Sequence, residues 1–317
     1  FGALFTALTS FDKPFNQAPS LHIALLILIW VVLARHLAPR WRWLLHGWMA
    51  LIGVSILTTY QHHFIDLPTG LAAGFLALWV LPDDAPSPLR GLAFTRDRKR
   101  RRLALLYAAG AAACVAIAML GGAWLWMFWP ATALALVALI YAAIGHRGFQ
   151  KDAGGRLSLA ARWLLAPYLA GAFLNSRIWT RRHPHATEVA DGVWIGRIPT
   201  ARELAPFAAI VDLCAEVSCG NPGARAYRSV GVLDLTTPSA GDLRDAADAI
   251  ESARAHGPVL VCCALGYSRS AAAVVSWLLT TRRVSSVDEA IAMVRRARPS
   301  IVLRAEAVMR SLPAIGS

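Results

Sequence analysis

Five apolar runs, most of them long enough to cross a lipid bilayer, occupy the first half of this chain. They lie at residues 21–38, 43–60, 67–82, 103–121 and 124–145. The hydrocarbon core of a bilayer is about 30 Å thick and requires roughly 20 apolar residues in a helix, which satisfies its own backbone groups. The whole chain is 56% hydrophobic and only 16% charged. We therefore expect a multi-domain protein that begins with an all-α polytopic membrane bundle.

Basic residues gather on one side of these runs. Arg35 lies near the end of the first run, Arg40 and Arg42 come just after it, and a basic segment fills residues 83–102. Because basic loops are retained in the cytoplasm, we expect this side to be cytoplasmic and the protein to be integral to a bacterial inner membrane. A basic linker at a membrane surface would contact anionic lipids. It accounts for the net charge of +13 without a nucleic-acid partner.

The last third of the chain shows a different pattern, in which short β-branched runs alternate with helical ones. Strands are expected at 193–195, 209–213, 230–233 and 259–262, and helices at 201–206, 242–255, 270–281 and 287–298. The alternation predicts one α/β domain over residues 185–317, with a central, mostly parallel sheet flanked by helices. Residues 103–146 would form two further transmembrane helices. Residues 157–176 would form an interfacial helix or, alternatively, another span.

Cys263 and Arg269 stand six residues apart, between an expected strand and an expected helix. A loop of this kind turns its backbone N–H groups toward the positive end of the helix dipole, which makes a pocket for a phosphate dianion. The same field favours a Cys263 thiolate that can attack phosphorus, while the planar Arg269 fork holds two phosphate oxygens. The loop itself contains Ala264, Leu265, Gly266, Tyr267 and Ser268. This chemistry requires no cofactor, and no metal-ligand spacing is visible in this half.

The segment from Cys263 to Ser270 resembles the loop of the dual-specificity (cysteine-dependent protein tyrosine) phosphatases, which reads His-Cys-x-x-Gly-x-x-Arg-Ser. The resemblance covers about residues 188–312. It implies hydrolysis of phosphomonoesters through a phosphocysteine, with the Ser270 hydroxyl hydrogen-bonded to the departing thiolate. Cys262 stands where the family has His, and we expect it to be a small buried residue.

The resemblance also implies a general acid on a loop roughly thirty residues upstream, a group worth about 10²–10⁴ in rate. Asp234 fits that spacing best. Asp242 is the alternative, although it could instead cap the following helix. Asp212 lies inside an expected strand, and we interpret it as structural.

Two polar clusters interrupt the apolar runs near residues 19–22 and 55–66. They resemble the Pro-Ser-x-His and Ser-x6-His-x3-Asp blocks of the membrane phosphatidic acid phosphatase type 2 superfamily, and most closely its inositol-phosphorylceramide and sphingomyelin synthase branch. This resemblance implies a nucleophilic His62 oriented by Asp66, with His22 as proton donor, facing the periplasm. The domain would cover residues 1–82. Because the chain begins at Phe1 and the first phosphate-binding block is not visible, we expect this domain to be truncated at its N-terminus.

These patterns together predict a membrane-anchored phosphatase that acts on a phosphoprotein or on a phosphorylated lipid head group. One alternative is a lipid phosphatase or head-group phosphotransferase that works through His62. Another is a non-catalytic module that only binds phosphate.

Overall fold

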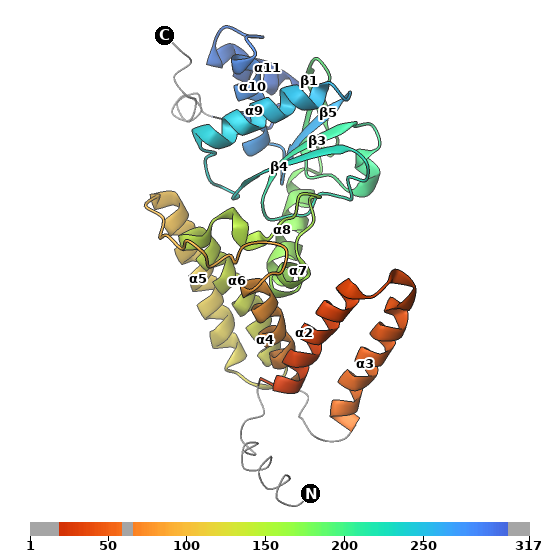
Figure 1. Ribbon diagram of the computed structural model, residues 1–317. Coiled ribbons are helices and arrows are strands. Elements are labelled where there is room, and N and C mark those ends of the chain that lie inside the picture. Colours follow the sequence, from red (N-terminus) through yellow and green to blue (C-terminus); the bar gives the residue numbers. More distant parts are fainter. Residues whose placement is uncertain (1–18, 59–65, 304–317) are drawn as a thin grey trace, which may run out of the picture. The chain divides into compact units, whose positions relative to one another are not determined.

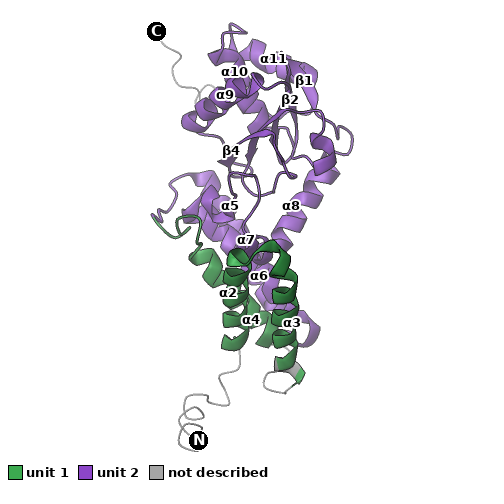
Figure 2. Cartoon of the chain, turned by 45° about the vertical axis from the view of Figure 1, so that its right-hand side comes forward, with its two compact units in different colours: residues 1–90 green, residues 91–317 purple. Residues whose placement is uncertain are grey.

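The computed structural model describes residues 19–58 and 66–303, and the chain divides into two compact units. Unit 1 comprises residues 1–90 and unit 2 comprises residues 91–317 (Figure 2). Each unit is described by itself below.

In its described residues, unit 1 contains three helices that follow one another along the chain. They are α2 (Leu21–His36), α3 (Arg42–Thr58), preceded by the 3₁₀ turn η1 (Pro39–Trp41), and α4 (Asp66–Val80). Helix α4 lies close against α2 because Gly70 has no side chain there: a Cβ atom at this position would lie 2.7 Å from the Cβ of Ile23 and from the carbonyl oxygen of Ser20. The N-terminal ends of α2 and α4 therefore lie together.

Unit 2 begins with a helical part. Its elements are α5 (Arg98–Ala118), η2 (Gly122–Met127), α6 (Phe128–Leu139), the π-helical turn η3 (Ile140–Ile144), η4 (His146–Phe149), α7 (Leu159–Leu164) and α8 (Ala166–Trp179). Asp97 caps α5 by accepting a hydrogen bond from the Lys99 N–H at 2.7 Å. The helix expected over 157–176 is divided into α7 and α8, and Pro167 stands in the first turn of α8, where its missing N–H costs no hydrogen bond.

Within the described residues, two helical segments are long and apolar enough to cross a membrane, at 98–118 and 122–144. Helices α2 and α4 are apolar but shorter than a full span. In the segment at 98–118, only 17% of the most apolar stretch is buried inside the protein. A polytopic membrane bundle thus stays a prediction.

The rest of unit 2 is an α/β domain built on a five-stranded sheet (Figure 1). The strands are β1 (Thr187–Ala190), β2 (Val193–Arg197), β3 (Ala209–Cys214), β4 (Ala226–Val232) and β5 (Val259–Cys263), and their spatial order is β1-β2-β5-β3-β4. Only β1 runs antiparallel to its neighbour, so the predicted mostly parallel sheet is confirmed. Strand β1 was not predicted, although Asp191 and Gly192 both have positive φ angles (49° and 77°) and form a hairpin turn typical of an Asp-Gly pair.

Both faces of the sheet are covered, so its strands carry apolar residues in both directions. Val259, Val261 and Cys263 of β5 face a core formed with α9 (Ala240–Arg254), α10 (Arg269–Thr280) and α11 (Val287–Ala297). Leu260 and Cys262 face the opposite core, beneath loop residues 198–207. The 3₁₀ turn η5 (Ala201–Leu204) replaces the short helix predicted in that loop. Strands β3, β4 and β5 run parallel, so their carboxyl ends meet at one edge of the sheet.

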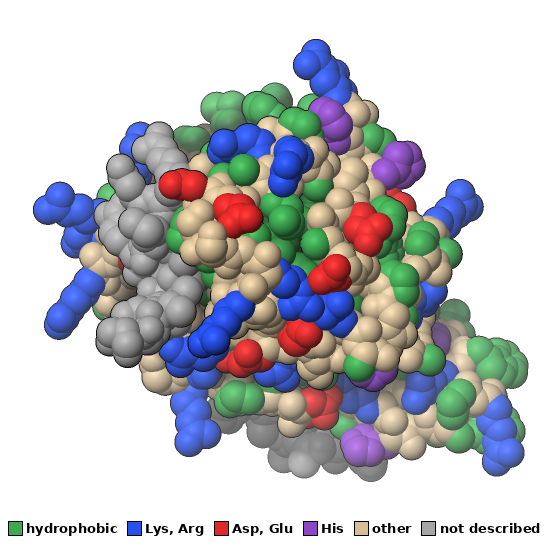
Figure 3. All heavy atoms as spheres, turned by 90° about the horizontal axis from the view of Figure 1, so that it is seen from above, with side chains coloured by type: hydrophobic (Ala, Val, Ile, Leu, Met, Phe, Trp, Pro, Cys, Tyr) green, Lys and Arg blue, Asp and Glu red, His purple; other side chains and the backbone are tan. Residues whose placement is uncertain are grey.

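One outer face of the α/β domain is drawn in Figure 3. Acidic and basic side chains are interspersed over it, with hydrophobic side chains scattered between them. Such mixed charge is typical of a surface in contact with water. The surface of helix α5 differs from this mixed surface, because its apolar side chains Leu105 and Leu106 are 71% and 59% exposed.

A buried ion pair joins the helical part of unit 2 to the sheet. Lys151 Nζ donates to Asp212 Oδ2 at 2.5 Å and to the carbonyl oxygens of Cys214 and Val217. The Tyr227 hydroxyl donates to the same carboxylate oxygen at 2.7 Å. Burial alone would lower the pKa of Lys151, but the attraction of Asp212 outweighs it and raises that pKa. Asp212 thus has the structural role expected from its place in a strand.

Candidate active site

The loop between β5 and α10 contains the expected nucleophile and the expected arginine at its two ends. Cys263 is the last residue of β5, and Arg269 is the first residue of α10. The loop closes because Gly266 has a φ of +75° and packs directly on β2: a Cβ there would lie 2.5 Å from the carbonyl carbon and oxygen of Gly196. Any side chain at Gly266 would push the loop away from the sheet.

Hydrogen bonds converge on the Cys263 sulfur. The Gly266 N–H donates to Sγ at 3.2 Å, and the Ser270 Oγ lies 3.3 Å from Sγ, at a distance from which it can donate to a thiolate. Burial would raise the pKa of the Cys263 thiol. The charge of Arg269 and the hydrogen bonds from Ser270 and Gly266 outweigh burial and hold that pKa below its usual range. The thiol is thus favoured as a thiolate.

Arg269 is buried and tied to two carboxylates. Its Nη1 and Nη2 atoms bind the two oxygens of Glu216 at 2.9 and 2.7 Å, in a bidentate pair. Nη1 also donates to the carbonyl oxygen of Val232 at 2.7 Å, and Nη2 donates to Asp234 Oδ1 at 2.8 Å. All four Nη hydrogens are therefore committed to partners.

Asp234 follows the end of β4 and has the features of a proton donor. Burial raises the pKa of its carboxyl, Arg269 opposes that rise, and the nearby Glu216 adds to it, so that the pKa is raised overall. The Tyr141 hydroxyl donates to the Asp234 carbonyl oxygen at 3.0 Å. The alternative acid, Asp242, forms a capping box with Ser239 at the start of α9 instead, with Ser239 Oγ donating to Asp242 Oδ2 at 2.8 Å.

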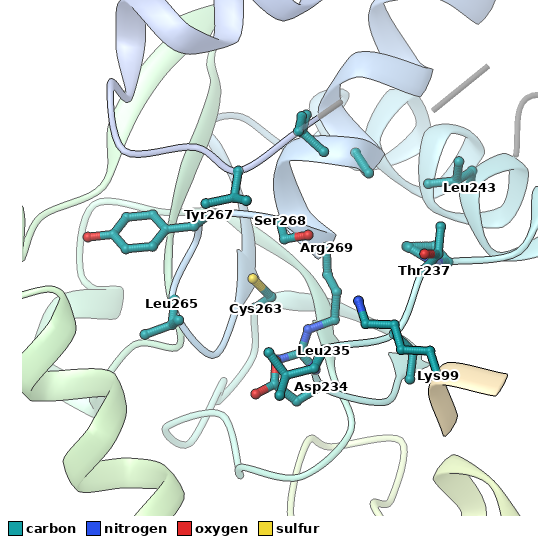
Figure 4. Close-up of a pocket in the computed structure, with 15 residues that line it drawn as sticks. Lys99, Asp234, Leu235, Thr237, Leu243, Cys263, Leu265, Tyr267, Ser268 and Arg269 are labelled. Atoms are coloured by element: carbon teal, nitrogen blue, oxygen red, sulfur yellow. The ribbon is translucent and has the colours of Figure 1, made fainter. Parts of the chain in front are cut away.

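Cys263, Asp234 and Arg269 line one cavity of about 540 Å³ (Figure 4). The other residues that line it are Lys99, Leu235, Thr236, Thr237, Pro238, Leu243, Leu265, Tyr267, Ser268, Ala272, Val302 and Leu303. Most of these side chains are apolar, and Asp234 and Arg269 lie on the same side of the cavity as Cys263. The structure thus brings the sequence-predicted nucleophile, arginine and acid together at the carboxyl edge of the sheet.

The outer side of the phosphate loop is held by helix α8. The buried Ser176 Oγ donates to the carbonyl oxygen of Ala264 at 2.5 Å, and the Tyr267 hydroxyl donates to the carbonyl oxygen of Trp179 at 3.2 Å. In Figure 4 the Tyr267 ring points away from Cys263. Sequence reasoning missed this support, because no local pattern links residues so far apart along the chain.

Glu216 was also missed, although a signal for it exists. It lies two residues after the end of β3, and β3 is a parallel neighbour of β5 in the sheet. A carboxylate at the carboxyl end of a neighbouring strand lies close to the phosphate loop by topology alone. Cys262, where the related loop has His, is fully buried as expected, and burial raises its pKa well above the usual range.

The candidates in unit 1 are only partly described. His22 is exposed on the first turn of α2, and Asp66 is buried at the start of α4. His62 lies outside the described residues. Among the residues that the structure describes, no three His, Cys, Asp or Glu side chains are grouped so that they could hold a metal ion.

Comparison with known proteins agrees with this site. Residues 194–315 match the family described as dual specificity phosphatase, catalytic domain. Mouse dual specificity phosphatase 28 is 39% identical over 127 residues, which cover 37% of this chain and 75% of that protein. The chain belongs to the dual specificity phosphatase family. The human protein of the same name is 36% identical over 126 residues, which cover 37% of this phosphatase and 69% of the human protein.

Solved structures match the same part of the phosphatase. The crystal structure of human DUSP28 is 26% identical, with a TM-score of 0.36, and the match covers 39% of this chain and 94% of that one. The structure of Tk-PTP in the active form is 30% identical, with a TM-score of 0.36, and the match covers 41% of this chain and 97% of that one.

Proposed function

We propose that this chain is a membrane-anchored phosphatase that hydrolyses phosphomonoesters through a phosphocysteine at Cys263. The observation that carries the proposal is the single cavity in which a thiol of lowered pKa, a buried arginine and a carboxyl of raised pKa lie side by side. A nucleophile and an acid whose pKa values are shifted in opposite directions can be thiolate and neutral acid at the same pH.

In the first step, the Cys263 thiolate attacks phosphorus, so that an S–P bond forms as the P–O bond to the leaving group breaks. Arg269 holds the transferring group. The four Nη hydrogens are committed, so a phosphate that binds at Nη2 takes the place of Asp234 there. The displaced Asp234 then lies beside the incoming phosphate and gives its proton to the leaving oxygen.

In the second step, water attacks the phosphocysteine. The Asp234 carboxylate takes a proton from this water, the S–P bond breaks, and inorganic phosphate leaves. The Ser270 hydroxyl, 3.3 Å from Sγ, donates to the thiolate as it departs. The enzyme returns to its starting protonation state.

Membrane anchoring is supported by the helical part of unit 2. The segments at 98–118 and 122–144 are long enough to span, and the apolar Leu105, Leu106 and Leu120 on and beside α5 are more than half exposed. The basic residues at the start of α5 would face anionic lipids on the cytoplasmic side of an inner membrane. The phosphatase domain would then act in the cytoplasm, where thiols stay reduced, on a phosphoprotein or a phospholipid.

The proposal is tested on the full chain in detergent micelles by measuring phosphate release from para-nitrophenyl phosphate. Cys263→Ser abolishes release because a hydroxyl of ordinary pKa replaces the thiolate. Cys262→Ala, a change at the adjacent buried thiol, is the matched control and retains it. A folded wild-type protein that binds phosphate and releases none from any ester would instead be a phosphate-binding module.

A second candidate function concerns unit 1. Ser20 and Asp66 are both 1% exposed at the adjoining N-terminal ends of α2 and α4, a costly position for polar groups in an apolar helical unit. We propose for this end a lipid phosphatase or head-group transfer activity in which His22 donates a proton and His62 is the nucleophile. Hydrolysis of phosphatidic acid that survives Cys263→Ser and is lost in His22→Ala supports it. Loss of that hydrolysis in Cys263→Ser contradicts it.

A further inference from the structure

One cation in the wall of the phosphatase cavity comes from outside the α/β domain. Lys99 belongs to the first turn of α5, far upstream of Cys263, and lines the same cavity. Figure 4 shows its ammonium end pointing into the space beside Arg269 and Thr237. The family match begins at residue 194, so Lys99 lies outside the matched region.

The Lys99 ammonium is not committed to another side chain within the described part of the protein, whereas Arg269 is paired with Glu216 and Asp234. It is close enough to Asp234 for its charge to oppose, in small part, the burial that raises the pKa of that carboxyl. Two carboxylates face Arg269, so this guanidinium alone does not make the cavity attractive to a polyanion. Lys99 supplies an additional positive charge.

Helix stability does not explain this lysine. A helix has the positive end of its dipole at its N-terminus, where cations are unfavourable. Residues 98–102 of α5 are nevertheless all basic. After this basic turn, α5 continues into an apolar, largely exposed stretch of spanning length. If α5 spans the bilayer, Lys99 lies at the level of the lipid head groups, where one wall of the cavity would also lie.

The remainder of the cavity wall suits a lipid more than a peptide. Leu235 and Val302 line it and are 55% and 70% exposed to the surroundings, so apolar side chains form part of its rim. A ligand that extends from Cys263 toward α5 meets Lys99 and, if α5 spans the bilayer, then the membrane surface. A second anionic group on the membrane side of the reacting phosphate would therefore pair with Lys99.

We propose that the substrate is a phospholipid whose head group carries a phosphomonoester in addition to its phosphodiester, and that Lys99 binds the phosphodiester while Cys263 attacks the monoester. This inference rests on the proposed phosphocysteine activity. Lys99 is a specificity-determining residue that contacts the substrate and takes no part in proton transfer.

The test uses the full chain reconstituted in phosphatidylcholine vesicles that contain phosphatidylinositol 4-phosphate, which has both phosphates, or phosphatidic acid, which has only the monoester. Lys99→Ala is expected to raise KM for phosphatidylinositol 4-phosphate about tenfold, which corresponds to about 1.4 kcal/mol. KM for phosphatidic acid and for para-nitrophenyl phosphate should change little. Lys99→Arg should restore most of the loss, and Arg101→Ala, a neighbouring basic residue outside the cavity wall, is the control.

Three results would overturn the inference while leaving the phosphatase activity standing. In the first, Lys99→Ala raises KM for all three substrates equally. In the second, deacylated glycerophosphoinositol 4-phosphate is hydrolysed as well as the vesicle-borne lipid, so that the second phosphate is recognised without a bilayer. In the third, a phosphotyrosine peptide is the better substrate and is unaffected by Lys99→Ala. A wild-type protein that releases no phosphate even from para-nitrophenyl phosphate would overturn both proposals.

Discussion

Arg269 and Asp234, which both take part in the proposed reaction, bind each other in the structure. The pair is 2.8 Å long, and it competes with any phosphate that approaches Nη2. Breaking it costs little, because Glu216 still balances the buried guanidinium through two hydrogen bonds. In the proposed mechanism, the substrate phosphate would thus free the acid at the point where its proton is required.

The pH profile follows from the two shifted groups. Activity should rise with pH as Cys263, whose pKa is lowered, loses its proton, and should fall at higher pH as Asp234, whose pKa is raised, loses its own. Asp234→Asn is expected to lower kcat by about 10²–10⁴ and to abolish the fall at high pH, because the amide cannot donate a proton. The measurement is kcat/KM for para-nitrophenyl phosphate between acid and alkaline pH.

Asp242→Asn is the matched control for this profile, because Asp242 caps α9 and its carboxylate binds the backbone N–H of Ser239. The pH profile of this variant should keep both the rise in activity and the fall at higher pH. If Asp242→Asn removes the fall in activity at high pH while Asp234→Asn retains it, the assignment of the acid is wrong.

Among the residues of the site, those that lie close together along the chain can be predicted from the sequence. Cys263, Arg269 and Ser270 are fixed by a single loop, so spacing suffices to find them. Glu216 binds Arg269 and Lys99 lines the cavity, and both come from other elements, brought there by the pairing of strands and by the path of α5. Local spacing contains no information about such contacts.

Among the elements, helix α8 has the most direct effect on the phosphate loop. Ser176→Ala removes the donor to the Ala264 carbonyl and leaves that group buried without it, at a cost of about 1–3 kcal/mol. We expect the loop to relax and the pKa of Cys263 to rise toward its ordinary value. The rate of Cys263 alkylation by iodoacetamide as a function of pH measures this shift directly.

Asn175→Ala, a change at the exposed neighbour on the same helix, should leave the alkylation profile unchanged. An unaltered profile in Ser176→Ala would mean that α8 covers the loop without positioning it.

The elements themselves could be predicted where their period is regular. The strands at β2, β3 and β5 follow the expected ranges closely, because burial on both faces gives short apolar runs. The helices α9, α10 and α11 do so as well. The break between α7 and α8 and the short edge strand β1 were missed. β1 is only four residues long and half-buried, so it has no clear apolar period.

At the scale of the whole of unit 2, the Lys151–Asp212 pair joins the helical part to the sheet. Lys151→Met leaves Asp212 buried without its cation and should lower the free energy of unfolding by about 3–5 kcal/mol. Urea unfolding of the full chain in detergent, followed by tryptophan fluorescence, measures the change. Adding Asp212→Asn to Lys151→Met should recover part of the loss.

The matched control is Arg156→Met. Arg156 forms an exposed pair with Asp152 at 3.6 Å, which is worth at most about 1 kcal/mol. If Lys151→Met and Arg156→Met lower the free energy of unfolding equally, burial of the Lys151–Asp212 pair does not add to its contribution to stability.

A fragment of residues 185–317 contains the complete family match but lacks Lys151 and Ser176. We expect it to melt at a lower temperature than a fragment of residues 146–317, and to release phosphate from para-nitrophenyl phosphate more slowly. Both quantities are measured on the purified fragments side by side. Identical melting temperatures would show that the sheet does not depend on the segment before it.

The wall that Lys99 contributes also bears on selective inhibition. Compounds that bind only the phosphate loop meet Cys263, Gly266 and Arg269, which follow the pattern common to the family, and therefore discriminate poorly among its members. A compound that spans the cavity from the thiol to the Lys99 ammonium would contact a helix that lies outside the shared region. Such a compound would distinguish this enzyme from phosphatases that have the same loop.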